Sequence, residues 1–208
     1  RVAPGPSGAP SRGRPDVLPT GRTFYSVDLR AVPTPPAWAL GWKSAGLLVT
    51  RHLQDHGEWP RAVALSVWGT ANMRTGGDDI AQALALMGVR PTWDPSSLRV
   101  TGFEVLPTDL LDRPRVDVTL RVSGFFRDAF AGLIDLFDAA ARKGASLDEL
   151  AHLNPLAARV RAEGGGREAA TRVFGSKPGA YGAGLQALIE EGGWTDAGDL
   201  ARAYVAWG

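Results

Sequence analysis

The chain has 208 residues, of which 44% are hydrophobic and 22% are charged, so it is long enough and apolar enough to build a core without covalent cross-links. Its 23 basic and 22 acidic residues leave a formal net charge of +1, which gives no electrostatic reason to expect nucleic acid or an anionic membrane as a partner. The absence of cysteine excludes disulfides, iron–sulfur clusters and thiol nucleophiles, and no apolar run is long enough to span a membrane. We expect a soluble, cytoplasmic protein.

Residues 1–22 are rich in proline and glycine and show no hydrophobic period, so they predict a linker or an extended arm. Several arginines make this segment mildly basic, but a solvated connector is favoured over a docking arm. The chain does not begin with methionine, and a helical pattern is still running where the sequence stops. We therefore expect the sequence to be an interior piece of a longer protein.

Residues 23–144 predict an α/β layer. A short strand is expected over residues 24–27, and a long helix that opens on two prolines is expected to end near Gly57. Residues 62–68 then form an almost unbroken apolar run. Such a run is typical of a central parallel strand that is covered on both faces.

The second part of this layer alternates strands and helices. A helix over residues 78–88 leads into a strand over 89–93, which we expect to continue the parallel sheet. Another strand is expected over 100–106, and residues 115–122 alternate between apolar and polar side chains, as a half-exposed strand does. A helix with an apolar stripe follows over residues 124–144.

From residue 145 onward the pattern contains helices only, separated by glycine-rich segments. The predicted fold class is therefore α/β, with a mostly parallel sheet and flanking helices over residues 23–144. A helical extension over residues 145–208 follows it.

Two polar loops follow predicted strands, at residues 68–78 and 123–128. In open α/β sheets, ligands bind where such loops leave the carboxyl ends of the strands. If the two strands are neighbours, the loops face each other across one crevice. The alternatives are an ordinary connection for the first loop and a capped helix start with an internal charge pair for the second. The residues that could bind a ligand here are Asn72, Arg74, Thr75 and Arg127, with Asp128 beside them.

A third loop, which is rich in glycine, covers residues 175–184 and contains Lys177 and Tyr181. It resembles a phosphate-binding loop in composition but not in register, because the lysine precedes the glycines. It could present Lys177 and Tyr181 to a ligand, or it could be a simple hinge. The sequence lacks a Walker loop, a dinucleotide fingerprint, the G-x-S-x-G turn of hydrolases and the H-E-x-x-H motif of zinc proteases.

His52 and His56 are four residues apart, so a helix places both on one face, where they could chelate a divalent metal ion. A third ligand is not evident, and histidine is also common near helix C-termini because it interacts favourably with the helix dipole. The structural interpretation is favoured over the metal site.

Taken in order, several strings resemble the large, tetrapyrrole-binding subunit family of ATP-dependent cobaltochelatase, which is shared with the H subunit of magnesium chelatase. The likeness extends from Asp16 to Gly208, and the central loop is closer to the cobalt branch. The strings lie at residues 18–22, 25–28, 32–34, 68–76, 113–118, 124–128, 172–174 and 179–181. One departure is Thr23, where the family pattern has asparagine, so a ligand contact at that position is in doubt.

The resemblance implies a metal chelatase, a ligase that inserts Co²⁺ into hydrogenobyrinic acid a,c-diamide in aerobic cobalamin biosynthesis. It also implies that an AAA+ ATPase subunit hydrolyses ATP, that a third subunit takes part, and that this piece alone is inactive. On this basis Arg74, Asn72 and Arg127 would grip the ring, while Asp128 or His56 would lie on the path of the metal or the leaving protons.

Two other functions stay open. One is a magnesium chelatase large subunit that acts on protoporphyrin IX, and the other is a non-catalytic α/β module that scaffolds the ATPase subunits.

Overall fold

The structure is a computed structural model that describes residues 3, 5, 10, 15–22, 27–177, 182 and 184–207. The strand expected over 24–27, apart from its last residue, and the departure at Thr23 lie outside these residues. The described elements are η2 (Pro15–Val17), η3 (Thr20–Arg22), η4 (Leu29–Ala31), α1 (Pro35–His56), β1 (Ala62–Val67), α2 (Gly69–Thr75), α3 (Asp78–Met87), β2 (Val89–Trp93), β3 (Val100–Val105), α4 (Thr108–Leu111), β4 (Asp117–Val122), α5 (Gly124–Ala129), α6 (Ala131–Ala145), α7 (Pro155–Ala162), β5 (Val173–Gly175), α8 (Gln186–Glu190) and α9 (Ala197–Trp207).

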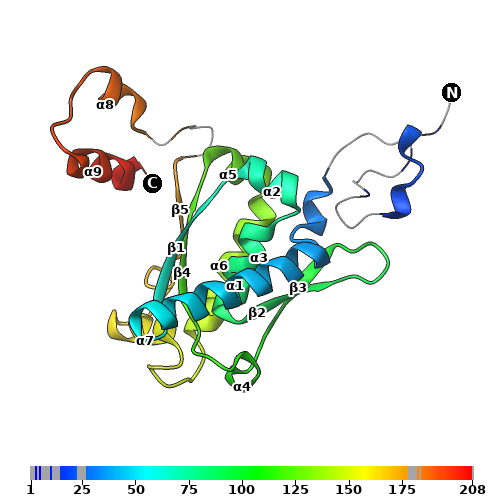
Figure 1. Cartoon of the computed structure of the whole chain (residues 1–208), viewed down its shortest axis with the longest axis horizontal. Coiled ribbons are helices and arrows are strands. Elements are labelled where there is room, and N and C mark those ends of the chain that lie inside the picture. Colours follow the sequence, from blue (N-terminus) through cyan, green and yellow to red (C-terminus); the bar gives the residue numbers. More distant parts are fainter. Residues whose placement is uncertain are drawn as a thin grey trace.

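The strands form two sheets, and the larger one is parallel throughout, with the order β1-β4-β5. Helices α1, α3 and α6 lie on one side of it (Figure 1), and the predicted α/β class with a parallel sheet is confirmed. The expectation for residues 89–93 is wrong: β2 pairs antiparallel with β3 in a separate two-stranded sheet. Short connections favour this pairing, because only a few residues separate the two strands.

The predicted roles of β1 and β4 are exchanged. Strand β1, expected to be covered on both faces, is an edge strand with Ala62, Ala64 and Ser66 exposed. Strand β4, expected to be half-exposed, is the central strand, and its polar residue Asp117 is 2% exposed. Small side chains tolerate exposure at an edge, whereas a central strand can hold a buried charge when a partner is supplied.

That partner is Arg172, which lies just before β5. Its Nε and Nη2 donate hydrogen bonds to the two carboxylate oxygens of Asp117, over 2.6 and 3.1 Å. The pair ties the start of β5 to the start of β4, and β5 adds a third parallel strand through Leu120, which pairs with Val173. The expectation that residues 145–208 contain helices only is therefore wrong at this point.

Helix α3 is at the centre of the core, and every apolar residue from Ile80 to Met87 is buried. Helix α1 packs on it at Gly41, where an added Cβ would lie 2.5 Å from the backbone nitrogen of Gln82. Only glycine permits this close approach of two helix backbones.

Two arginines hold the C-terminal end of α3. Arg113 donates to the carbonyl oxygens of Ala85 and Leu86, and Arg115 donates to those of Met87 and Gly88. These carbonyls belong to the last turn and to the residue that ends it, which lack the usual helical donors. Arg115 also forms a bidentate ion pair with Glu149 over 2.8 Å. Burial works to raise the pKa of Glu149, but its hydrogen bonds from Arg115 and from the Asn154 amide lower it on balance.

Within the described residues, no helix is both long enough and apolar enough to cross a membrane.

Candidate functional site

Strands β1 and β4 are neighbours, so the segments that follow them lie together at the carboxyl edge of the parallel sheet. The loop expected over residues 68–78 is mostly helical, since α2 covers Gly69–Thr75. Val67 and Val122 are register partners at the ends of the two strands. The amide of Ser123 donates to the carbonyl of Val67 over 2.9 Å, and its hydroxyl accepts a hydrogen bond from the amide of Gly69. Gly69 is needed here, because a Cβ would lie 2.5 Å from the ring of Phe125. Helices α2 and α5 therefore start side by side (Figure 1).

The end of β5 adds a third segment to this edge. The loop that contains Lys177 was expected to contact a ligand, but the strand that brings it here was not expected. Gly175 pairs with Val122, and the exposed Lys177 follows two residues later. An added Cβ at Gly175 would lie 3.0 Å from Nη2 of Arg127, so the guanidinium of Arg127 lies over the end of β5. The sequence pattern of β5 is too short to indicate a strand, because β5 has only three residues and lies between glycine-rich segments.

Two of the predicted ligand-binding cations, Arg127 and Lys177, thus lie at one edge of the sheet, and the third, Arg74, lies on the adjacent helix α2. Arg127 is half-buried, and its Nε is buried without a hydrogen-bond partner among the residues that the structure describes. Arg74, in the last turn of α2, is exposed, as are Lys177 and Asp128. We call the exposed and half-exposed side chains of this region, namely Trp68, Arg74, Phe125, Arg127, Asp128, Phe174 and Lys177, the carboxyl-edge site.

Asn72 is buried and Thr75 is half-buried, and both side chains bond to neighbouring backbone or side-chain groups. Asn72 is 0% exposed, and its amide donates to the carbonyl of Trp68 over 2.9 Å and to Asp79 Oδ2 over 3.3 Å. The Thr75 hydroxyl donates to the carbonyl of Ala71 and accepts from the amides of Gly77 and Asp78. In this arrangement both side chains hold the turn from α2 into α3.

Asp79 is a titratable group that sequence reasoning assigned only to a helix start. Burial raises the pKa of its carboxyl, the neighbouring Asp78 adds to this increase, and the hydrogen bond from Asn72 opposes it. The positive charge of Arg74 also opposes it, which links Asp79 electrostatically to the carboxyl-edge site. A perturbed carboxyl beside a candidate site is a typical feature of functional centres.

Three aromatic side chains are exposed at the same edge. Trp68 is 55% exposed, Phe125 is 36% exposed and Phe174 is 43% exposed. Trp68 joins β1 to α2, Phe125 lies in the first turn of α5, and Phe174 belongs to β5. Exposed aromatic rings provide flat apolar surface, which polar loops alone do not. No periodic pattern in the sequence indicated that these rings share one edge.

The histidine pair lies elsewhere. The rings of His52 and His56 are 4.4 Å apart in the last turns of α1, which leads into the start of β1. They are thus at the amino end of the sheet, separated from Asp128 by the length of a six-residue strand, about 20 Å. His56, which the sequence offers as an alternative to Asp128 on the path of the metal or the protons, therefore lies at the opposite end of the sheet from Asp128.

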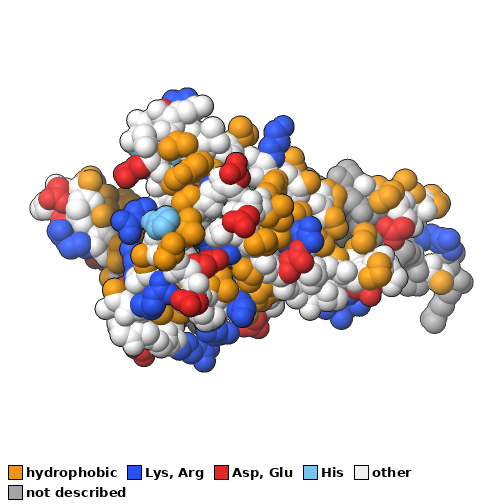
Figure 2. All heavy atoms as spheres, turned by 90° about the horizontal axis from the view of Figure 1, so that it is seen from below, with side chains coloured by type: hydrophobic (Ala, Val, Ile, Leu, Met, Phe, Trp, Pro, Cys, Tyr) orange, Lys and Arg blue, Asp and Glu red, His pale blue; other side chains and the backbone are white. Residues whose placement is uncertain are grey.

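Figure 2 shows the molecule from below, the side toward which the amino ends of the parallel strands point, and basic, acidic and apolar side chains are interspersed there. No group of three His, Asp or Glu side chains is placed to hold a metal ion in the described ranges. The other predicted ligand-binding residue, Tyr181, lies outside those ranges.

Comparison with known proteins matches all of residues 1–208 to the family model CobN/Magnesium Chelatase. The chain is 64% identical over its whole length to the aerobic cobaltochelatase subunit CobN of Pseudomonas aeruginosa, of which it covers 18%. It is 39% identical over 99% of its length to the magnesium-chelatase subunit ChlH of Oryza sativa subsp. japonica, of which it covers 15%.

Among solved structures, the catalytic subunit of cobaltochelatase from Mycobacterium tuberculosis matches with a TM-score of 0.87 and 54% identity. That match covers 100% of this chain and 18% of the solved chain. The sequence thus spans less than a fifth of the relatives that it matches. The chain belongs to the CobN/magnesium chelatase family.

Proposed function

We propose that this chain is part of the large subunit of an aerobic, ATP-dependent cobaltochelatase and that its carboxyl-edge site holds the tetrapyrrole during Co²⁺ insertion. One observation supports this most directly. The motif residues Arg113, Arg115 and Arg172 are used by the fold, whereas the exposed or half-exposed cations of the strings at 68–76 and 124–128 lie at the ends of the parallel strands. The 64% identity to a cobaltochelatase subunit favours cobalt over magnesium.

The chemistry of the proposed substrate fits this surface. Hydrogenobyrinic acid a,c-diamide presents a flat, largely apolar ring with carboxylates and amides around its rim. Trp68 or Phe125 provides a face for the ring, and Arg127 and Lys177 provide charged donors for the rim. Asn72 is then a positioning residue, which fixes the start of α2 through the carbonyl of Trp68.

Metal insertion also requires a base, because the corrin ring binds the ion as a monoanion and the proton on its inner nitrogen leaves as the ion enters. We assign this task to Asp128, with Asp79 as the second candidate because its raised pKa brings it closer to the range where protons exchange at neutral pH. We assign the ring to this chain, and no group of three potential metal ligands is found among the described residues. Delivery of Co²⁺ and hydrolysis of ATP belong to other parts of a cytoplasmic complex with an AAA+ subunit and a third subunit.

The test is the affinity of the full chain for hydrogenobyrinic acid a,c-diamide, measured by quenching of tryptophan fluorescence. Arg127→Gln and Arg74→Ala should each weaken binding, by about 10-fold or more for a lost charge-assisted hydrogen bond. Arg51→Gln is the matched control, because Arg51 is an exposed arginine on α1 that pairs only with Asp55 in the described structure. Unchanged affinity in both site variants contradicts the proposal, and so does an equal loss in the control.

A further inference from the structure

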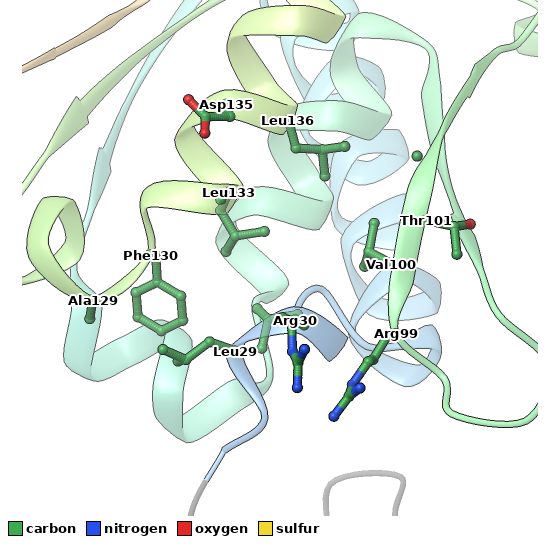
Figure 3. A pocket seen from close by; sticks show the side chains of 13 residues that line it. Leu29, Arg30, Arg99, Val100, Thr101, Ala129, Phe130, Leu133, Asp135 and Leu136 are labelled. Carbon is green, nitrogen blue, oxygen red and sulfur yellow. The ribbon is translucent and has the colours of Figure 1, made fainter.

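A separate cavity of about 500 Å³ lies between the start of α6, the start of β3 and the turn η4 (Figure 3). The residues assigned to the carboxyl-edge site do not line it. Its volume is within the usual range for sites that bind small molecules. The cavity is therefore large enough for a ligand of its own.

Its inner wall is apolar. Phe130 and Leu133, at the start of α6, are 2% and 4% exposed and form part of the hydrophobic core. Leu136 continues this wall one turn further along α6, and Val100 faces it from β3 (Figure 3). An apolar group that enters the cavity would replace water on these side chains, which is favourable.

The rim carries two arginines that share one carboxylate. Nε of Arg99 donates to Asp28 Oδ2 over 2.8 Å, and Nε of Arg30 lies 3.7 Å from Asp28 Oδ1. One negative charge thus fixes two positive ones, and the side chains of Arg30 and Arg99 lie next to each other at the opening (Figure 3). Burial works to raise the pKa of Asp28, but the hydrogen bond from Arg99 and the two positive charges lower it. The group therefore carries a net charge of +1 at neutral pH.

The terminal nitrogens of these two arginines are not used by Asp28, so their N–H groups can donate hydrogen bonds to a ligand. Within the described ranges, the terminal nitrogens of Arg30 and Arg99 form no hydrogen bonds, because both side chains meet Asp28 through Nε. Asp135 also lines the cavity, but its carboxylate lies further along α6, away from the two guanidinium groups (Figure 3). Two adjacent guanidinium groups with free donors are suited to a carboxylate.

The first turn of α6 adds to this positive potential. Its N-cap, Phe130, supplies no side-chain hydrogen bond to the first amides of this 15-residue helix, and its carbonyl accepts from the amides of Leu133 and Ile134. Gly132, in that turn, lines the cavity, and nothing lies within 4 Å of the position that a Cβ would take. The cavity thus has a positive rim above an apolar wall.

We propose that this cavity binds a small organic acid in which a carboxylate is attached to an apolar ring or chain. The carboxylate binds between Arg30 and Arg99, and the apolar body packs on the wall formed by α6. This site is distinct from the carboxyl-edge site and does not depend on the function proposed for it.

The probe is 1-pyrenebutyrate, whose fluorescence reports binding of an apolar ring that carries a carboxylate. The full chain should bind it about 10-fold or more tightly than it binds the uncharged alcohol 1-pyrenebutanol. Arg99→Gln should weaken binding of the acid by a similar factor and leave the alcohol unchanged. Arg90→Gln, which removes an exposed arginine that pairs with Glu104 on the β2–β3 hairpin, should change neither.

A second variant tests the cavity itself without touching a charge. Gly132→Leu should fill the cavity and abolish binding of the acid, while the open space around Gly132 allows the fold to stay intact. Gly46→Leu is the matched control, because Gly46 is also a helical glycine with nothing near its Cβ position, and it lies on α1. Equal affinity for the acid and the alcohol, or unchanged binding in Gly132→Leu, would overturn the proposal.

Discussion

At the scale of single residues, Gly76 and Gly77 after α2 lie against the segment that precedes α1. Gly77 has a φ of 94°, and a Cβ there would lie 2.5 Å from Cγ1 of Val32. The amide of Thr34 donates to the carbonyl of Gly76, and Thr34 also caps α1. The conspicuous glycine pair after α2 therefore fixes the contact between two distant segments of the chain.

Asp79 provides a prediction at this scale, because its pKa is raised in the folded state. A carboxyl with a raised pKa favours the fold when it is protonated, and this contribution is lost as the pH rises through the folded-state pKa. Asp79→Asn should therefore be more stable than the parent chain at pH 7, as measured by urea unfolding. The advantage should disappear toward pH 3, below the ordinary value of 3.8. An advantage that persists unchanged at low pH would mean that the charge of Asp79 is not its cause.

The sequence predicted the chemistry of several side chains without their roles. Arg74 and Arg127 were expected near a ligand, and both lie at the edge where the strands end. Asn72 belongs to the same loop, but helix α2 turns it inward, onto Asp79. The residue types in the sequence indicate which segment could bind a ligand. The direction of each side chain depends on the residue at which helix α2 begins.

At the scale of elements, helix α1 contains a matched pair of glycines with opposite surroundings. Gly41→Ala would place its Cβ 2.5 Å from the α3 backbone, whereas Gly46→Ala meets nothing within 4 Å. We expect Gly41→Ala to destabilise the chain by about 1–3 kcal/mol, because two packed backbones must separate. Gly46→Ala should stabilise it by about 0.5–1 kcal/mol, since alanine is the better helix former. Urea unfolding of both variants checks this, and effects of the same sign would contradict it.

The elements that were predicted correctly are those with long periodic patterns. Helices α1 and α3 follow their apolar stripes closely, whereas the single helix expected over residues 124–144 is divided at Phe130 into α5 and α6. The position of a strand within a sheet was not predictable in the same way, because the burial of Asp117 depends on Arg172, 55 residues later. The alternating pattern of β4 was interpreted without that partner. Strand β5 was missed for the related reason that three residues carry almost no periodicity.

At the scale of the whole molecule, the two ends of the parallel sheet differ in the side chains that they carry. The amino end holds structural charges, such as the pair of Asp117 and Arg172 and the nearby Arg159. The carboxyl end has exposed aromatic rings and a buried guanidinium nitrogen without a partner in the described residues. Candidate ligand-binding residues at the carboxyl end were predictable from the order of strands and loops, but the structural charges at the amino end and the contribution of β5 were not.

The most direct test of the account is amide hydrogen exchange of the full chain with and without hydrogenobyrinic acid a,c-diamide. The account predicts slower exchange on ligand addition at residues 68–75 and 123–128 together, with no change at residues 52–61 at the amino end. Slower exchange confined to the amino end, or no change in either loop at saturating ligand, would contradict it.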